Sequence, residues 1–396
     1  MKIWGGVILA ISCVPTAVLA APGSDRGFNI TASATLSYDD NVFRTPDGVT
    51  RPGRHRSDTI LTPSIGVGFA APVGPVQLAL EGDVGYLFHR RNPSLDRETV
   101  DAALSAASRL MGCDVGVNSA FGRAQSDLAD LLGDRDVNIE NRFNAGANLL
   151  CGDDIGLRPG ISYNYTRVTN SAEIRKQSNY SANTYTASLG YSRPSFGLMS
   201  VYGSYRDGSY PNRRELGPGL GANDRVRVYS TGLSYSRSIG SRLSGQGSIG
   251  YMKVKPRNDS APDYSGLTYS GEIGFQGGDR ISGSLGFART ADQSNLFLVS
   301  YTISTRYDAA VRYALGSSMS LRGGAAYTRR NFKTSLLSDV LAGRTDTTKQ
   351  FDLGLDYSLG RAWRLSLLGT HTTRDSELSA LNYSANRIAF TAGLQF

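Results

Sequence analysis

The chain has 396 residues, a formal net charge of +8, 40% hydrophobic and 19% charged residues, and it is rich in glycine (46) and tyrosine (21). The low charge and abundant aromatic residues argue against intrinsic disorder. The glycines follow no three-residue period that would indicate collagen, and no heptad pattern indicates a coiled coil. Apolar residues alternate with polar ones, which is typical of half-buried β-strands, so the composition favours an all-β protein.

Residues 1–20 show the order of regions found in a secretory signal peptide. A single positive charge at Lys2 precedes an apolar run over residues 3–11, and small and apolar residues follow at 18–20. The run is shorter than the roughly 20 apolar residues of a membrane-spanning helix. We expect cleavage after Ala20, followed by a short periplasmic segment over residues 21–27.

Residues 28–396 are expected to form a membrane domain. From Phe28 to Tyr38 an apolar residue occupies every second position, with Asn, Thr and Ser between them. Alternating segments of about ten residues, joined in turn by tight turns and longer polar loops, are the signature of transmembrane β-barrel strands. About 18 such strands (16–18) can be placed, and an even number puts both termini in the periplasm. The predicted fold is a transmembrane antiparallel up-and-down β-barrel with short periplasmic turns and longer extracellular loops.

The connections between these strands alternate in length along the chain. Short turns are expected near residues 72–75, 111–114, 151–154, 192–196, 238–241, 276–279, 316–318 and 360–362. Longer connections are expected near residues 39–57, 90–98, 126–135, 168–178, 207–224, 255–263, 292–297, 331–346 and 374–383.

Aromatic residues support a bilayer environment, because such rings settle at membrane interfaces. We expect these to face outward, many near strand ends: Tyr163, Tyr165, Tyr191, Tyr235, Tyr251, Tyr269, Tyr301, Tyr307, Tyr313, Tyr327, Tyr357 and Trp363. A soluble β-sandwich or propeller would need a second apolar layer. The residues expected inward are Ser, Thr, Gly, Asn and charged residues, which suit water and leave nothing from which to build a dry core.

The last residues alternate in the same way and close on an aromatic residue. Phe390, Leu394 and Phe396 share one face of the terminal segment. This ending resembles the C-terminal signal by which outer-membrane barrels are recognised, so the barrel assembly machinery is an expected partner. The expected location is the outer membrane of a Gram-negative bacterium.

Along each strand, the residues that alternate with the outward apolar ones have what we call inward parity. Assigning this parity strand by strand predicts a charged lumen. The expected lumen residues are Glu81, Asp83, Asp101, Arg109, Glu140, Arg142, Arg158, Arg206, Glu272, Arg306, Asp308, Arg312, Arg322, Asp352, Asp356, Arg364 and Arg387. Both signs are present, so this is no single-sign selectivity ring. Two interpretations stay open: the groups hydrogen-bond sugar hydroxyls and pair with uronate carboxylates, or they neutralise one another and stiffen the wall.

The basic excess suggests contacts with anionic lipids or glycans. Loop clusters such as Arg51, Arg54 and Arg56, or Arg213 and Arg214, are expected to meet lipopolysaccharide or an anionic glycan. Outer-membrane lipid is the other expected partner. Nucleic-acid binding is not predicted, because the arginines are scattered over the loops and strand ends of an exported protein.

Signals for catalysis are weak. The histidines His55, His89 and His371 are expected in or near outer loops, and no Gly-Ser-Gly elbow, zinc-ligand spacing or Walker loop accompanies them. We therefore predict no enzymatic activity, no cofactor and no metal site. An outer-membrane hydrolase is a distant alternative.

One segment resembles a known family. LSYDDNVFRTPDG, with Tyr38, Asp39, Asp40 and Asn41, precedes a Ser57–Asp58 pair and resembles the opening of the Putative beta-barrel porin 2 family. The resemblance implies an outer-membrane pore that assists export of an exopolysaccharide or capsular polysaccharide, with a polysaccharide-export (Wza-like) protein and an anionic glycan as partners. The alternatives are a general diffusion porin or a structural barrel. The three polar motif residues either bind an ion or sugar or stabilise the turn that leaves the first strand.

The two cysteines outside the expected signal peptide, Cys113 and Cys151, are predicted to form a disulfide. Both flank one hairpin beside periplasmic turns, in an oxidising compartment. Pairing residues whose numbers sum to 264 sets Phe121 opposite Phe143, both apolar and outward, and places the two cysteines directly across from each other. Directly opposed residues have Cβ atoms roughly 4.5–5.5 Å apart, within reach of a disulfide after small adjustment. Two separate thiols are the alternative, if the register slips.

Overall fold

The computed structural model describes residues 27–49, 53–126, 138–216, 224–257, 262–293, 299–334 and 344–396. The expected signal peptide and residues 21–26 lie outside this part of the chain. Within the described ranges, no helix is both long enough and apolar enough to cross a membrane.

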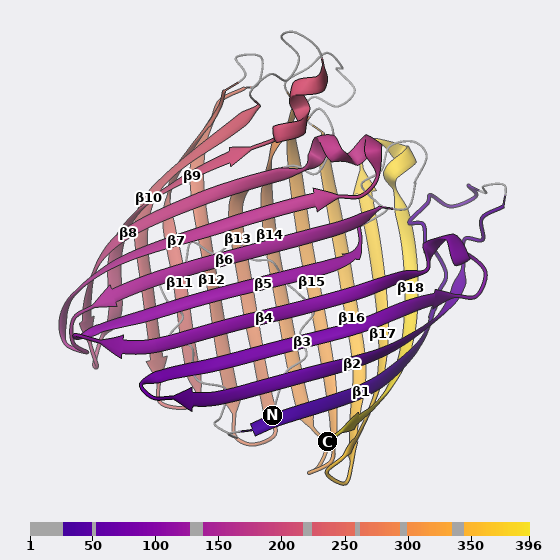
Figure 1. Cartoon of the computed structure of the whole chain (residues 1–396), viewed down its shortest axis with the longest axis horizontal. Helices are drawn as coiled ribbons and strands as arrows, with labels where there is room; N and C mark the ends of the chain where they lie inside the picture. The colour runs from indigo at the N-terminus through magenta and orange to yellow at the C-terminus, as the bar shows by residue number, and fades with distance from the viewer. Residues whose placement is uncertain are drawn as a thin grey trace.

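The described residues form a barrel of eighteen antiparallel strands (Figure 1). The strands are β1 (Gly27–Asp39), β2 (Asp58–Val73), β3 (Val76–His89), β4 (Arg97–Leu110), β5 (Cys113–Gln125), β6 (Ile139–Cys151), β7 (Gly156–Asn170), β8 (Tyr180–Arg193), β9 (Gly197–Ser209), β10 (Arg225–Ile239), β11 (Leu243–Pro256), β12 (Tyr264–Gly277), β13 (Ile281–Gln293), β14 (Val299–Ala314), β15 (Met319–Thr334), β16 (Thr345–Leu359), β17 (Trp363–Ser376) and β18 (Tyr383–Gln395). Every strand pairs with its sequence neighbours, and β1 pairs with β18 to close the sheet. The predicted up-and-down barrel and its strand number are confirmed.

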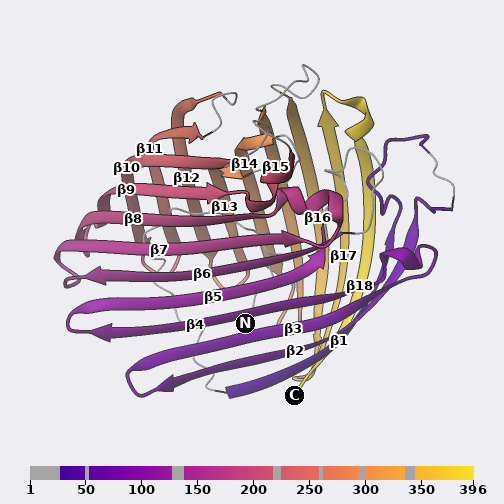
Figure 2. The ribbon, with the colours of Figure 1, turned by 45° about the horizontal axis from the view of Figure 1, so that its top comes forward.

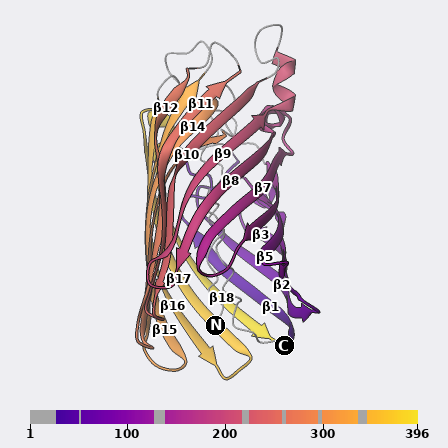
Figure 3. The ribbon, with the colours of Figure 1, turned by 90° about the vertical axis from the view of Figure 1, so that its left-hand side faces the viewer.

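The connections separate the barrel into two ends, which we call the turn end and the loop end (Figure 3). At the turn end the links are short, and Gly240 and Gly360 adopt positive φ angles of 62° there, a conformation that glycine takes at little steric cost. At the loop end the links are longer. Within the described residues, four of them carry short 3-10 helices: η1 (Pro93–Leu95), η3 (Glu173–Ser178), η4 (Pro211–Leu216) and η5 (Ser379–Leu381). In bacterial barrels the short turns face the periplasm.

The strands tilt strongly, so those of the near wall cross those of the far wall. In Figure 1, β2–β8 run across the view in front of β11–β17, which run upward. Figure 2 shows the same two walls from nearer the loop end. Because side chains alternate along each strand and pairing carries parity from strand to strand, one set of residues faces the interior all the way round.

A girdle of aromatic side chains lies on the outer face toward the loop end. Tyr163, Tyr185, Tyr205 and Tyr229 come from four successive strands, and neighbouring rings have centroids 5.2, 6.5 and 5.2 Å apart. Further round, the hydroxyls of Tyr269 and Tyr307 lie 3.0 Å apart. Such belts mark the membrane interface. The expected outward aromatic residues are exposed or half-buried with one exception.

Tyr301 is the exception, because it is 1% exposed and its hydroxyl donates to the Pro262 carbonyl at 2.7 Å. The expectation that it faces lipid is wrong. It lies at the start of β14, next to a register shift between Val299 and Tyr301. There its side chain contacts the connection between β11 and β12, in which Pro262 lies.

The alternation also inverts at the loop end. Val226 and Val228 of β10 and Met252 and Val254 of β11 have inward parity and are buried. They form a cluster together with Val168, Tyr180, Tyr210, Ala291, Tyr301 and Ile303. We call this the loop-end cluster. The expectation that no dry core could be built from inward residues is therefore wrong here, although it describes the polar middle of the barrel.

Candidate functional site: the barrel lumen

The predicted lumen residues share one face of the sheet. The pairing sets Asp83 opposite Asp101, which lies opposite Gly122, which in turn lies opposite Arg142. The same parity continues through the remaining strands and returns across the β1–β18 seam, where Arg387 pairs with Asp39. All the predicted residues therefore have inward parity. They do not form one constellation but gather in separate groups along the wall.

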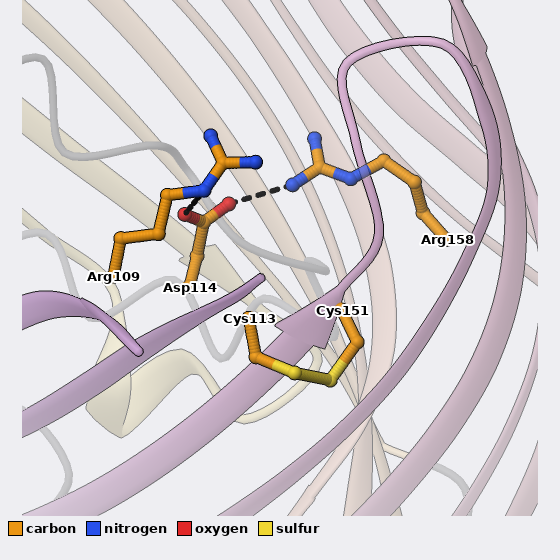
Figure 4. The surroundings of a disulfide bond; sticks show 5 residues. All are labelled: Arg109, Cys113, Asp114, Cys151 and Arg158. Carbon is orange, nitrogen blue, oxygen red and sulfur yellow. Dashed lines mark hydrogen bonds and ion pairs between the residues drawn. A yellow bond between two sulfur atoms is a disulfide. The ribbon is translucent and has the colours of Figure 1, made fainter. Parts of the chain in front are cut away.

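The first group lies near the turn end on β4–β7 (Figure 4). Arg158 contacts the Asp114 carboxylate at 2.6 Å, and Arg109 lies 4.0 Å from the same carboxylate and 3.5 Å from Asp153. Arg158 is nearly buried, with 8% exposed. Sequence reasoning missed Asp114 because residues 111–114 were expected to form a turn, whereas β5 already begins at Cys113.

The second group lies on β14–β17. Arg306 and Asp308 form an ion pair at 3.0 Å within one strand. Arg312 and Arg322 each lie 3.6 Å from the Asp356 carboxylate, so one carboxylate is shared between two guanidinium groups. Arg322 also donates to Ser366 at 2.9 Å. Cations and carboxylates on this wall thus largely pair with each other.

The third group joins strands that are far apart in the sheet. Glu140 and Arg142 form an ion pair at 2.9 Å, and Arg206 of β9 donates to the Ala291 carbonyl of β13 at 3.1 Å. Asp292 of β13, which sequence reasoning missed, interacts electrostatically with Arg206 and Arg142. Arg206 thus links β9 to β13 beside the loop-end cluster, and Arg142 of β6 exerts an electrostatic effect on the Asp292 carboxylate.

The remaining predicted residues form weaker or neutral contacts. Side-chain amides contact Glu272 and Asp352 at 3.3 and 3.1 Å, Arg364 donates to the Trp363 carbonyl at 3.3 Å, and Arg387 donates to Ser37 at 3.2 Å. Asp83 and Asp101 form no ion pair with any residue in the described ranges. Glu81 lies opposite Gly68 on β2 and Ala103 on β4.

Hydroxyl and amide groups line the lumen between the charged groups. Hydroxyl pairs lie 2.8 Å apart at Ser33–Ser64, 2.8 Å at Thr35–Thr391, 2.9 Å at Ser248–Ser270 and 3.1 Å at Thr186–Ser204. A cavity on the inner side of β9–β13 is lined by Tyr202, Ser204, Ser230, Thr268, Thr290 and neighbouring residues. This surface can hydrogen-bond a polyhydroxylated molecule.

A buried ionic group, also missed from the sequence, closes part of the loop end. Asp346 is fully buried and contacts Arg374, lies 2.9 Å from Arg344 and 4.0 Å from Arg330, and accepts from Ser376 at 2.5 Å. We call Asp346 and its three arginines the Asp346 group. The signal in the sequence was weak, because the members of the group come from β15, β16, β17 and the residue that precedes β16, and only the fold brings them together.

The motif residues sit where the barrel closes. Asp39 accepts from the Asn41 amide at 2.9 Å and pairs with Arg44 at 2.8 Å. The Asn41 side chain donates to the Thr45 and Ser384 carbonyls at 2.8 and 2.9 Å, while Asp40 accepts from Asn386. Tyr38 is exposed on the outer face. The motif thus fastens the first loop to β18, the arrangement of a stabilised turn.

The three histidines lie in different parts of the barrel. His55 lies in the first loop, His89 ends β3 beside Asp96 at 3.2 Å, and His371 lies within β17, where it contacts Asn386 at 2.7 Å. No three metal-ligating residues in the described part of the chain are placed to hold an ion.

Several loop arginines already have partners within the protein. Arg56 pairs with Asp47 at 2.5 Å, and Arg213 is buried against Asp224 at 2.5 Å and over the Tyr210 ring at 3.6 Å. Arg213 is therefore not available to the lipid surface. Arg51 and the Arg214 side chain lie outside the described residues.

The cysteines have the predicted register. Cys113 lies opposite Cys151, and Phe121 opposite Phe143. The structure joins the two cysteines in a disulfide. Figure 4 shows this bridge on the other side of the sheet from the Arg109–Asp114–Arg158 group, at the base of the β5–β6 hairpin. The bridge fastens the turn end of this hairpin from outside the lumen.

Comparison with known proteins supports the resemblance. The model of the family described as Putative beta-barrel porin 2 matches residues 228–396, which confirms the resemblance over β11–β18 and most of β10. The motif at residues 36–58 lies outside the matched part. No curated protein sequence matches the chain. The closed barrel and the family match identify an outer-membrane β-barrel porin fold.

Several solved bacterial protein structures are similar to the chain in outline. OccAB3 of Acinetobacter baumannii is 12% identical, with 93% of this chain and 98% of that chain covered and a TM-score of 0.47. OpdK of Pseudomonas aeruginosa, solved with vanillate, is 10% identical, with 93% and 99% covered and a TM-score of 0.47. OccK2 (OpdF) of the same organism, in complex with glucuronate, is 13% identical, with 93% and 98% covered and a TM-score of 0.47.

Proposed function

We propose that the chain forms a passive outer-membrane channel through which an exopolysaccharide or capsular polysaccharide leaves the cell. The observation that carries this proposal is the lumen wall, where hydroxyl and amide groups alternate with cations and carboxylates that mostly pair along the wall. Ser248–Ser270 and Thr35–Thr391 are examples of the hydroxyl pairs. Such a wall offers many exchangeable hydrogen bonds to a glycan and little net field of one sign.

Three kinds of partner follow from this function. A periplasmic polysaccharide-export (Wza-like) protein would deliver the polymer at the turn end, and the polymer itself would be an anionic glycan. The barrel assembly machinery would read the terminal segment, where the Phe396 amide donates to the Ile30 carbonyl at 2.9 Å and the Phe396 side chain is exposed. The channel would need no catalytic group, because export through it is diffusion of a finished polymer.

A general diffusion porin is the second candidate. The pairing of Arg312 and Arg322 with Asp356 favours it to the same degree, because paired charges also suit a channel with little selectivity among small solutes. The two candidates differ in what accumulates when the channel is lost. An export channel retains polymer in the periplasm, whereas a diffusion porin slows the uptake of small solutes.

The test uses a deletion strain that carries the wild-type chain or one of two variants. Ser248→Phe places a bulky ring in the lumen, and Thr231→Phe places the same ring on the lipid face of the neighbouring strand. We expect deletion and Ser248→Phe to lower surface glycan and raise periplasmic polymer, while Thr231→Phe restores export. Unchanged glycan output together with slower uptake of small sugars would overturn export in favour of the diffusion porin.

A further inference from the structure

A row of cationic side chains follows the outer face of the barrel, just beyond the aromatic girdle. On seven strands a basic residue stands two positions closer to the loops than an outward aromatic residue, and therefore on the same face. The pairs are Phe121 and Arg123, Tyr165 and Arg167, Tyr229 and Arg227, Tyr251 and Lys253, Phe287 and Arg289, Tyr327 and Arg329, and Phe351 and Lys349. We call these seven basic residues, together with Lys255 of β11, the cationic belt.

The belt is densest on β10–β11. Arg227 lies directly opposite Lys255, and Lys253 lies opposite Tyr229. Like charges directly opposite each other on a sheet destabilise it. Arg227, Lys253 and Lys255 are exposed, and none of them forms an ion pair with a residue in the described ranges. Such an arrangement is stabilised when an anion lies between the cations.

Carboxylates do not neutralise this surface. Asp207 of β9 lies opposite Arg227, but its closest ion-pair partner is Arg225, at 3.9 Å. The four cations of this part of the surface therefore face one carboxylate. Elsewhere in the belt, Arg123 pairs with Glu98 at 2.5 Å and Lys349 lies 3.7 Å from Asp375, while Arg167 and Arg329 form no ion pair among the described residues.

The position of the belt specifies the kind of anion. Aromatic girdles mark the edge of the hydrocarbon region, and two residues along a strand span roughly 7 Å before tilt is considered. The belt therefore lies at the level of lipid headgroups at the loop end, which faces the outer leaflet in bacterial barrels. At this level the residues of inward parity are apolar and buried, as Val228 and Met252 are. The cations can therefore be reached only from the lipid side.

We propose that the cationic belt, centred on Arg227, Lys253 and Lys255, binds the phosphate groups of lipid A in the outer leaflet. Guanidinium and ammonium groups donate charge-assisted hydrogen bonds to phosphate oxygens. The tyrosine rings of the girdle pack beside the first carbons of the acyl chains. This interaction is independent of what passes through the lumen, and it places the lipid contact on the strands and not on the loop arginines.

The experiment measures binding of the barrel, in neutral detergent, to diphosphorylated lipid A, to dephosphorylated lipid A and to phosphatidylglycerol. The test variant is Arg227→Gln with Lys255→Gln. The matched control is Arg193→Gln with Arg237→Gln, two cations of outward parity near the turn end of β8 and β10. Heat-modifiable migration on gels verifies that each barrel has assembled.

At low salt we expect the test variant to bind diphosphorylated lipid A about twentyfold more weakly than the wild type, since each basic residue near an anionic surface contributes about fivefold. The control should bind like the wild type, and the wild-type affinity should fall as salt screens the charges. If the test variant does not assemble, the wild-type barrel alone tests the proposal, which requires that it bind diphosphorylated lipid A more tightly than the other two lipids and that this affinity fall with added salt. Equal binding to dephosphorylated lipid A or to phosphatidylglycerol, or an equal loss in the control, would overturn the proposal.

Discussion

The middle of the barrel and its loop end use opposite patterns of polarity. Along β10, Leu233 and Tyr235 face outward in the middle while Ser230 and Ser234 face the lumen. A few residues closer to the loops, Arg225 and Arg227 have the outward parity and Val226 and Val228 the inward parity. The change follows from the solvent, because the outer face meets hydrocarbon in one region and water and lipid headgroups in the other.

Within one sheet, the distribution of polar and apolar side chains between the two faces therefore depends on the position along the strands. In the middle, the apolar outer face contacts lipid and the polar inner face is hydrated. At the loop end, the inner side chains pack on each other as in a soluble β-sandwich, with the loop-end cluster on one side and the Asp346 group on another. At the loop end, side chains that pack on one another therefore replace part of the hydrated lining found in the middle of the barrel.

The largest expected effect comes from breaking the Asp346 group. Asp346→Ala leaves Arg330, Arg344 and Arg374 without their shared carboxylate, and removing one partner of a buried ion pair costs about 3–5 kcal/mol. The free energy of unfolding in denaturant, measured in lipid vesicles, should fall by this amount. Asp375→Ala is the control, because its pair with Lys349 is exposed and contributes at most about 1 kcal/mol. Equal losses in both variants would show that the Asp346 group is not buried.

A second comparison uses one residue type in both regions. Met252 is 2% exposed within the loop-end cluster, whereas Met199 is 43% exposed on the outer face of β9. Met252→Ala should lower the free energy of unfolding by about 2–5 kcal/mol, as truncation in a packed core does. Met199→Ala should cost less, because lipid chains fill the space that the side chain leaves. A larger loss at Met199 would contradict a packed interior at the loop end.

A third change tests the outer face. Leu233→Lys introduces a charge between the two interfacial tyrosines of β10 and should cost about 2–4 kcal/mol in a bilayer. Arg225→Leu, at the loop end of the same strand and face, should change the free energy of unfolding by less than about 1 kcal/mol. Equal tolerance of Leu233→Lys in lipid vesicles would mean that this part of β10 does not face hydrocarbon.

Much of the fold could be predicted from the sequence, because alternation and turn residues are local signals. The strand number, the connections and the β5–β6 register that opposes Cys113 and Cys151 follow from them. The inversion could not be predicted in the same way. The apolar positions shift by one residue between Val228 and Tyr229, but alternation alone does not say which face meets lipid, water or protein.

The polar groups of the lumen illustrate the same limit. Parity placed Arg206 on the inner face, but its partner lies on β13, four strands away in the sheet. Arg206 contacts the Ala291 carbonyl, and Asn41 of the first loop reaches the Ser384 carbonyl of the last strand. No local pattern encodes contacts between segments so far apart in the sequence.

A cysteine scan of β10 tests the inversion most directly. In separate variants Arg227, Val228, Leu233 and Ser236 are each replaced by cysteine, with Cys113 and Cys151 retained in their disulfide. The rate of reaction with a small water-soluble maleimide is then measured in lipid vesicles. We predict fast reaction at Arg227→Cys (outward) and Ser236→Cys (inward), and slow reaction at Val228→Cys and Leu233→Cys. Reaction at positions of one parity along the whole strand would contradict the inversion.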